Sequence, residues 1–336
     1  MKHSTWKNRV RLAGALIAAG LLCAFALSAC GQASSSGSSG KDASKSSGGL
    51  EILFEQDDGL INNYTLIAVS PKAPFADADG KAVSDVKLNS TGAQAFIDWM
   101  LSDEGIELAK NYGVDTYGQA LFSIKDDAPH YTGDIPKATD ETKTVRLSTT
   151  TSVNDSGLLD ALLPTFEDKY GYKVEVYSAG TGKAIANAKN GNADAILVHS
   201  KSQEEAFVKD GFAYTLPGFD SERLTYMYNY FVLCGPADDP AGVKEAGSAK
   251  DAFAKIAESK SKFVSRGDKS GTHTKEVSLW PEDLGITTEA DSVAKYTDWY
   301  IYSNAGMGDC LTMAKEQGAY ILSDKATYLS FTANQK

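Results

Sequence analysis

In the middle of the chain, short apolar runs alternate with amphipathic stretches, and polar turns separate them. The apolar runs predict strands at Thr144–Leu147, Tyr172–Tyr177 and Ala193–Val198. After the first strand, leucines and Phe166 recur at helical spacing and predict an amphipathic helix. A second helix is predicted at Ala184–Lys189, before the third strand. This alternation of strand and helix predicts an α/β protein with a parallel sheet.

The same two patterns continue on both sides of this region. Between residues 91 and 112 the apolar spacing is helical, with a break at Ser102 that can cap a second helix. Residues 125–143 are polar and contain two prolines, so they predict a linker. A chain of 336 residues has room for two lobes. Further strands are predicted at Leu50–Phe54, Thr65–Val69, Tyr228–Leu233 and Lys262–Val264, and further helices at Ala249–Glu258 and Cys310–Glu316.

The N-terminal segment has the pattern of an export signal. Four positively charged residues precede an apolar stretch that ends in Leu27-Ser28-Ala29-Cys30. This ending matches the lipobox of bacterial lipoproteins, so we expect residues 1–29 to be a cleaved signal peptide and Cys30 to carry lipid. A transmembrane anchor is the alternative, because the apolar stretch is close to spanning length. Residues 30–49 are mostly Ser, Gly, Ala and Lys and predict a flexible tether at a membrane surface.

The charge of the chain argues against nucleic acid as a partner. The net charge is −11, and it falls to −15 when the four positively charged residues of the signal segment are removed. A chain this acidic repels a polyanion. Any anion that the protein binds must therefore be held by a local group of donors.

Three predicted strand-to-helix turns, 148–152, 178–183 and 265–273, are rich in Ser, Thr and Gly, and a fourth, 304–309, is rich in glycine. Ligands of open α/β sheets bind beyond the carboxyl ends of the strands, where these turns lie. Each hydrogen bond to an ionised acceptor contributes roughly 1.5–3 kcal/mol, so about six donors suffice for tight binding of a small anion. The turns therefore predict an oxyanion site.

The turn at 265–273 carries the strongest signal. It leads from an apolar strand into a helix-like stretch that continues through Trp280, and it contains Arg266, Ser270 and Thr272. Free backbone N–H groups, hydroxyl donors and a planar guanidinium all suit an oxyanion. The alternative is a helix N-cap whose polar side chains only satisfy the backbone.

A nucleotide site at Gly180-Thr181-Gly182-Lys183 is rejected. Tyr177 and Ala184 stand where a P-loop requires Gly and Ser or Thr.

Catalytic and metal-binding patterns are weak. An exported phosphate-ester hydrolase using Ser270 or Thr151 as nucleophile needs a positioned base or a metal cluster, and the sequence shows neither. The four histidines are scattered, and neither Cys234 nor Cys310 has a companion at ligand spacing, so we expect no metal and no cofactor. The two cysteines are either buried thiols or, in an exported protein, a disulfide.

Several of these stretches together resemble the tungstate-binding substrate-binding proteins of ABC importers. The Thr-Thr-Thr-Ser run and the Ser-Arg-Gly-Asp-x-Ser-Gly-Thr-His run are specific in combination. The resemblance covers roughly residues 50–124 and 144–332. The stretches that carry it are Arg146–Ser152, Asn154–Leu159, Gly180–Ala184, Val264–His273 and Gly306–Gly308.

The resemblance implies an α/β, two-lobed periplasmic-binding-protein-like fold of type II, but the order of segments differs. In the family, the Thr-Thr-Thr-Ser strand opens the mature protein and the segment like residues 50–124 closes it, whereas here that segment comes first. We therefore expect a circular permutation in which residues 125–143 join the family's original termini. Lobe 1 is expected at 61–230, and lobe 2 at 50–60 plus 231–336.

The resemblance also implies a function. It is that of a lipid-anchored, extracytoplasmic receptor that binds tungstate, catalyses no reaction, and docks as a monomer on the membrane permease of an ABC importer. Molybdate is an alternative ligand of almost the same size, and phosphate and sulfate are further alternatives. Hinge closure would bring donors from both lobes to the anion. The implied oxyanion-binding residues are Thr150, Thr151, Ser152, Gly180, Thr181, Ser265, Arg266, Ser270, Gly271, Thr272, Met307 and Gly308.

Overall fold

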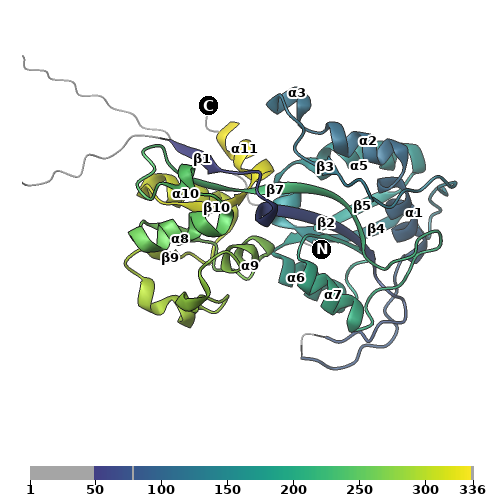
Figure 1. Cartoon of the computed structure of the whole chain (residues 1–336). Helices are drawn as coiled ribbons and strands as arrows, with labels where there is room; N and C mark the ends of the chain where they lie inside the picture. Colours follow the sequence, from purple (N-terminus) through teal and green to yellow (C-terminus); the bar gives the residue numbers. More distant parts are fainter. Residues whose placement is uncertain (1–48, 78, 334–336) are drawn as a thin grey trace, which may run out of the picture. The chain divides into compact units, whose positions relative to one another are not determined.

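One long strand, β7 (Leu224–Pro236), runs through the centre of the fold and pairs with different partners along its length. The computed structural model in Figure 1 describes residues 49–77 and 79–333, so the predictions for residues 1–29, for Cys30 and for nearly all of the tether lie outside the described residues. The first half of β7 pairs with β2 (Ile61–Ala68) and β3 (Ser123–Ile124), and its second half with β1 (Leu50–Phe54) and β10 (Ile321–Asp324). All four pairings are antiparallel.

We call lobe A the part built on the first half of β7. Its strands follow the order β5 (Lys173–Ala179), β4 (Thr144–Thr150), β6 (Ala195–Val198), β2, β7 and β3. Alternate residues of β2 and β6 enter two different cores, one with α1 (Ser90–Met100) and α5 (Leu158–Tyr170), the other with α6 (Thr181–Lys189) and α7 (Lys201–Lys209). Because helices cover both faces, these strands are apolar throughout, which explains the apolar runs of the sequence.

We call lobe B the part built on the second half of β7. There β8 (Phe263–Ser265) pairs in parallel with β9 (Tyr300–Tyr302), and a bridge from Phe263 to Tyr320 joins β8 to the start of β10. One core lies under α8 (Ala249–Ser259), and the other under α10 (Met307–Gln317). Since β7 is continuous between the lobes, the boundary expected at residue 230 stays a prediction.

Shorter helices complete the fold. Ser102 caps α2 as predicted, with its Oγ accepting from the backbone N–H of Gly105 at 3.3 Å. Residues 125–143 contain neither helix nor strand and are attached to lobe A by backbone bonds from Tyr131 and Ala138. No helix within the described ranges is long and apolar enough to cross a membrane. The remaining elements are α2 (Asp103–Asn111), α3 (Val114–Tyr117), α4 (Thr151–Asp155), α9 (Gly271–Val277), α11 (Lys325–Ala333) and the 3-10 helices Asp58–Leu60, Val243–Glu245, Glu282–Leu284 and Ala290–Tyr296.

The parallel arrangement predicted for the strands at Thr144–Leu147, Tyr172–Tyr177 and Ala193–Val198 is confirmed, because β4 pairs in parallel with both β5 and β6. The sheet as a whole is mixed, because β2 and β7 run between the lobes in opposite directions and each pairs antiparallel with its neighbours. One prediction about the elements was wrong. The helix expected to continue through Trp280 ends at Val277, since Pro281 disfavours helical geometry in the residue before it and Trp280 packs into the lobe B core. Cys234 and Cys310 are buried free thiols, so the disulfide alternative is excluded.

The aromatic core of lobe A gives a stability prediction. Phe166 is fully buried, and its ring centroid lies 5.3 Å from that of Trp99 and 5.1 Å from that of Tyr172. Phe166→Ala leaves a cavity and should lower the free energy of unfolding by about 3–5 kcal/mol in urea denaturation. Tyr177→Ala, at a side chain that is 45% exposed, is the control and should change it by less than about 0.5 kcal/mol. Equal losses in the two variants would contradict the packing described here.

Candidate functional site

The predicted turn at the end of β4 forms a tightly bonded corner of lobe A. Thr150 caps α4, with its Oγ1 accepting from the N–H of Val153 at 3.3 Å. Thr151 is the half-buried first residue of that helix, and Ser152 follows with only 4% of its surface exposed. The Ser152 hydroxyl lies 3.0 Å from Thr150 Oγ1 and 2.8 Å from Nε2 of His199. The hydroxyls of Thr150 and Ser152 therefore form one buried series of hydrogen bonds that leads to a histidine.

A second lobe A turn lies directly against lobe B. Gly180 precedes α6, and Thr181 is the fully buried first residue of that helix. Its Oγ1 accepts a hydrogen bond from the backbone N–H of Gly271, in lobe B, at 3.1 Å. Figure 1 shows α6 and α9, which begin at these two residues, near one another. The structure thus brings two of the predicted turns from different lobes into contact.

The lobe B corner is centred on Arg266, which is 4% exposed. Its Nη2 donates to Asp268 Oδ2 at 2.5 Å, and Asp268 Oδ1 accepts from the N–H of Ser270 at 3.1 Å. Ser270 in turn caps α9 by accepting from the N–H of His273 at 3.2 Å. Because α9 has only seven residues, the helix dipole expected from the sequence is small, and the charge of the corner comes mainly from Arg266.

Glu276 is a buried hydrogen-bond acceptor next to this corner. Its carboxylate accepts from Ser265 Oγ at 2.5 Å, from Tyr300 Oη at 2.6 Å and from Trp280 Nε1 at 2.9 Å. The Ser265 hydroxyl is therefore turned into lobe B. Burial raises the pKa of Glu276 to about 7.

The two corners leave no room for a larger residue at Gly271. A Cβ atom there would lie 2.8 Å from Cε1 of His199 and 3.1 Å from Oγ1 of Thr181. A Cβ atom at Gly180 would lie 3.8 Å from Asp268 Oδ2 and 3.8 Å from Ser270 Cβ. Gly271 of the lobe B corner therefore packs against His199, the histidine to which Ser152 is bonded.

Three polar atoms in the lobe B corner are buried without a hydrogen-bond partner among the described residues. They are Nε of Arg266, Oγ1 of Thr272 and Nε2 of His273. A buried, unpaired donor is costly, and such atoms in a native protein need an explanation such as a ligand. Arg266 and Thr272 belong to the predicted oxyanion set.

Met307 and Gly308 are placed differently from the other predicted residues. The Met307 side chain is 3% exposed and packs in the apolar core under α10, whereas Gly308 is exposed. The loop before them does adjoin the corner, because the N–H of Ala305 donates to the carbonyl of Arg266 at 3.1 Å. The structure does not bring the Met307 side chain to the hydroxyl-rich corners.

Sequence reasoning missed His199, Asn62 and Asp324. Nδ1 of His199 lies 2.9 Å from Oδ1 of Asn62, on the crossing strand β2. Asn62 Nδ2 lies 3.0 Å from Asn229 Oδ1, on β7, and 3.2 Å from Asp324 Oδ2, at the end of β10. The position of His199 directly after a buried strand was the available signal, because it places this side chain at the same sheet edge as Ser152.

The environment of His199 keeps it neutral. The side chain is 8% exposed, and its ring lies 5.1 Å from the Tyr64 ring. Burial and the nearby charge of Arg266 lower the pKa of His199 to about 3. The influence of Arg266 on this ring also indicates that the two corners share one electrostatic environment.

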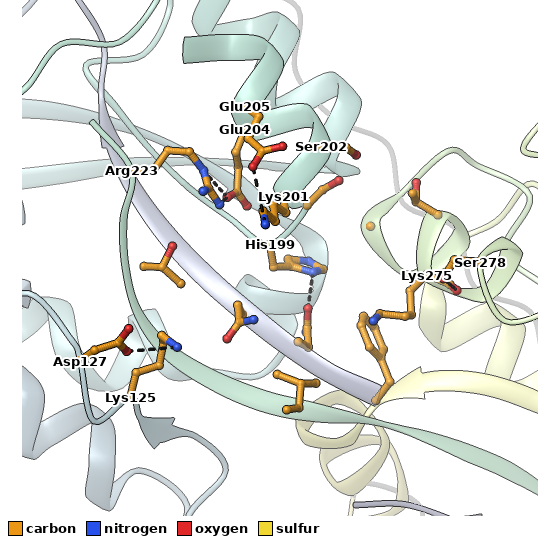
Figure 2. Close-up of a pocket in the computed structure, with 18 residues that line it drawn as sticks. Lys125, Asp127, His199, Lys201, Ser202, Glu204, Glu205, Arg223, Lys275 and Ser278 are labelled. Atoms are coloured by element: carbon orange, nitrogen blue, oxygen red, sulfur yellow. Dashed lines mark hydrogen bonds and ion pairs between the residues drawn. The ribbon is translucent and has the colours of Figure 1, made fainter. Parts of the chain in front are cut away.

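A groove of about 870 Å³ opens beside these corners. His199 and Gly271 form part of its wall, so the groove reaches the contact between the lobes. Its charged residues are mostly paired: Arg223 with Glu204 at 2.5 Å, and Lys125 with Asp127 at 3.2 Å. Figure 2 shows His199 among these residues.

Metal binding finds no support in the part of the chain that the structure describes. Within residues 49–77 and 79–333, no group of three His, Cys, Asp or Glu side chains is arranged to hold a metal ion. What the corners offer instead is hydroxyls, backbone N–H groups and one guanidinium, a set suited to an anion.

The fold is that of a periplasmic-binding-protein-like domain. Residues 137–336 match the PBP superfamily domain, and the chain belongs to this superfamily. The periplasmic-binding-protein-like fold predicted from the sequence is confirmed.

Individual relatives match over part of their length. The "Tungstate-binding protein TupA" of Peptoclostridium acidaminophilum is 46% identical over 204 residues, which cover 60% of this chain and 66% of that protein. The protein of the same name from Campylobacter jejuni is 39% identical over 186 residues, 55% of this chain and 63% of that protein. A crystal structure described as the tungstate ABC transporter from Geobacter sulfurreducens is 42% identical, covering 56% of this chain and 75% of that one, with a TM-score of 0.47. This chain spans between about half and two thirds of the length of the curated relatives that it matches.

The buried carboxyl under the lobe B corner gives a pH prediction. A carboxyl whose pKa is raised from 4.5 to about 7 by folding binds more protons when folded, so its contribution to stability is lost as pH rises through this range. One pKa unit corresponds to about 1.4 kcal/mol, so the loss is about 3 kcal/mol. Glu276→Gln should remove this part of the pH dependence.

The test compares urea unfolding of the parent protein and Glu276→Gln at about pH 4.5 and about pH 8. Other buried carboxyls with raised pKa values, such as Asp98 and Asp324, are present in both proteins and cancel in the comparison. The same pH dependence in both proteins would show that Glu276 does not titrate as described.

Proposed function

We propose that the protein is an extracytoplasmic solute receptor that binds tungstate between its two lobes and delivers it to the permease of an ABC importer. The two relatives named as tungstate-binding proteins support the ligand, and a further relative from Haloferax volcanii, named "Putative ABC transporter anion-binding protein" and 46% identical over 193 residues, supports the transport role. The observation that carries the proposal is the contact of the two corners across Thr181 and Gly271 at 3.1 Å, beside a buried Arg266 whose Nε is unpaired. A site of this kind holds an anion through donors from both lobes, so the anion stabilises their contact.

The proposed ligand residues divide between the lobes. Lobe A contributes Thr150, Thr151, Ser152, Gly180 and Thr181, and lobe B contributes Ser265, Arg266, Ser270, Gly271 and Thr272, with Met307 and Gly308 at its margin. Hydroxyl-bearing residues whose side chains are already bonded contribute through their backbone. Ser265 is one of these, because its hydroxyl donates to Glu276.

The donor set favours a fully deprotonated tetrahedral dianion, which is the form of tungstate and molybdate. Binding a protonated phosphate requires a carboxylate that can accept its hydrogen. Asp268 has both oxygens engaged, by Arg266 and by the N–H of Ser270, and Asp155 is exposed. Phosphate is therefore disfavoured, whereas molybdate and sulfate, which are also fully deprotonated dianions, remain alternative ligands.

A phosphate-ester hydrolase is disfavoured by the chemistry of His199. Ser152, His199 and Asn62 are linked by bonds of 2.8 and 2.9 Å, an arrangement like that of a nucleophile, a base and an orienting group. A general base works best when its pKa lies near the working pH. Burial and Arg266 lower the pKa of His199 to about 3, which makes it a poor base for activating Ser152.

The proposal includes an anchor and an assembly state. Lipid on Cys30 and the tether at 30–49 would hold a monomeric receptor at the outer surface of the cell membrane, within reach of its permease.

We also propose that the chain is circularly permuted relative to its family. The family match begins at residue 137, yet the segment before it supplies β1 to lobe B and the crossing strand β2. In the family order, α11 would lead into β1. These elements are neighbours here, because Tyr328 Oη donates to the carbonyl of Leu50 at 2.6 Å and Lys325 pairs with Glu55 at 2.8 Å.

Calorimetric titration with tungstate, molybdate, sulfate and phosphate tests the function. Tungstate should bind with a dissociation constant below micromolar, and Arg266→Ala should weaken it about tenfold or more, because a charged hydrogen bond is lost. Lys269→Ala is the matched control: this neighbouring cation is exposed, pairs with Glu289 at 2.6 Å, and should leave affinity unchanged. If none of the four anions binds, the receptor function is refuted, and equal effects of the two variants would remove Arg266 from the site.

A reordered chain tests the permutation. Residues 137–333, a Gly/Ser linker of about ten residues, and then residues 50–124 should fold and bind with the parent's affinity, since α11 and β1 are adjacent. The control is a second reordered chain whose new ends lie at Gly171, between α5 and β5. It breaks a packed connection and should lose stability. An insoluble reordered chain beside a soluble control would contradict the permutation.

A further inference from the structure

His199 lies where the proposed anion site meets the crossing strands. Its Nε2 is 2.8 Å from Ser152 Oγ, and its Nδ1 is 2.9 Å from Asn62 Oδ1. Both ring nitrogens are therefore engaged, and which of them carries the hydrogen determines what Ser152 can offer to a ligand.

The surroundings of Asn62 assign that hydrogen. The Asn62 amide nitrogen faces three oxygens: Tyr64 Oη at 2.8 Å, Asn229 Oδ1 at 3.0 Å and Asp324 Oδ2 at 3.2 Å. Exchanging the nitrogen and oxygen of this amide would set an oxygen against all three, so Oδ1 must be the atom that faces His199. An amide oxygen only accepts, and the ring hydrogen is therefore on Nδ1.

The neutral ring then determines which atom donates in each hydrogen bond from Thr150 through Ser152 to His199. With Nδ1 protonated, Nε2 is an acceptor, and Ser152 donates its only hydroxyl hydrogen to it. Thr150 Oγ1, 3.0 Å away, donates to Ser152 in the same direction. Ser152 Oγ is thus left with lone pairs alone, and a tetrahedral dianion also presents only lone pairs. A hydrogen on Nε2 as well would let the ring donate to Ser152 Oγ and release the Ser152 hydroxyl to the anion.

The local charges favour that extra proton when a dianion is present. Burial and, after it, the charge of Arg266 act against protonation of His199 in the free protein, and Arg266 is itself paired with Asp268. A dianion beside Ser152 acts in the opposite direction with twice the charge of Arg266. The other titratable or charged groups around the ring are Tyr64 and Asp324 at the crossing strands, Glu204 with Arg223 and Lys201 with Glu205 on the α7 side, and Lys275 on α9.

We propose that His199 is a positioning residue of the oxyanion site and takes up one proton when the anion binds, so that its ring donates to both Asn62 and Ser152. The inference rests on the proposed function. Since the complex holds one proton more than the separate partners, affinity rises as pH falls, by about tenfold per pH unit where uptake is complete.

Calorimetry of tungstate binding in buffers of different ionisation enthalpy counts the protons. At about pH 6.5 the parent protein should take up about one proton per anion, and His199→Phe should bind at least about tenfold more weakly and take up none. His130→Gln is the control, because this histidine is exposed and pairs with Asp103, and it should match the parent. Tungstate is the probe because it remains a dianion at this pH.

NMR of histidine-labelled parent protein supplies a measurement that does not depend on the folding of a variant. On addition of tungstate, the ring signals of His199 should shift to those of an imidazolium. Tight binding with no proton uptake, uptake that persists in His199→Phe, or a neutral His199 in the complex would each overturn the inference. If the parent binds none of the four anions, the proposed function itself fails, and that result is distinguishable from binding without uptake.

Discussion

The position of the two lobes relative to one another depends on one buried carboxylate, Asp324. Its Oδ2 accepts from Tyr64 Oη and Asn229 Nδ2, both at 2.7 Å, and its Oδ1 accepts from the N–H of Thr327 at 3.1 Å. Tyr64 lies on β2, Asn229 on β7, and Asp324 itself ends β10. A buried carboxylate is tolerated only when its lone pairs are used, so these bonds specify one register for the crossing strands. The bond between the N–H of Gly271 and Thr181 Oγ1, at 3.1 Å, is a further link between the lobes.

Some buried polar groups of lobe B are hydrogen-bonded within the protein, whereas others have no partner among the described residues. Three polar side chains are hydrogen-bonded within lobe B: Ser265 to Glu276, Ser270 to the start of α9, and Asp268 to Arg266. In the same corner, Arg266 Nε and Thr272 Oγ1 are buried and have no hydrogen-bond partner among the described residues. A pre-organised site keeps such donors unpaired because the surrounding bonds prevent them from turning to one another.

The sequence predicted most of the elements and the parallel arrangement of β4, β5 and β6, but not the antiparallel pairing of β2 and β7. Local signals were sufficient for α5, for Ser102 as the cap of α2, and for the apolar strands, because spacing and capping depend only on near neighbours. Helix α7 and strand β9 were missed, since a short polar helix and a three-residue strand carry little periodicity. The mixed sheet was missed because strand direction is set by where the chain crosses between lobes, not by the residues of one strand.

At the predicted site, the residue types indicated which kind of ligand to expect, and the tertiary structure decided which side chains contact one another. Turns of Ser, Thr and Gly after predicted strands, with Arg266 among them, predicted an oxyanion site from the sequence alone, because hydroxyls, backbone N–H groups and a guanidinium all donate hydrogen bonds to anions. Only the fold decided that the Ser265 hydroxyl faces Glu276, that the Met307 side chain enters a core, and that His199 and Asn62 join the site. Asn62 and His199 are 137 positions apart, and no local pattern connects them. Their contact exists because β2 and β6 are neighbours in one sheet, a relation that long-range pairing alone creates.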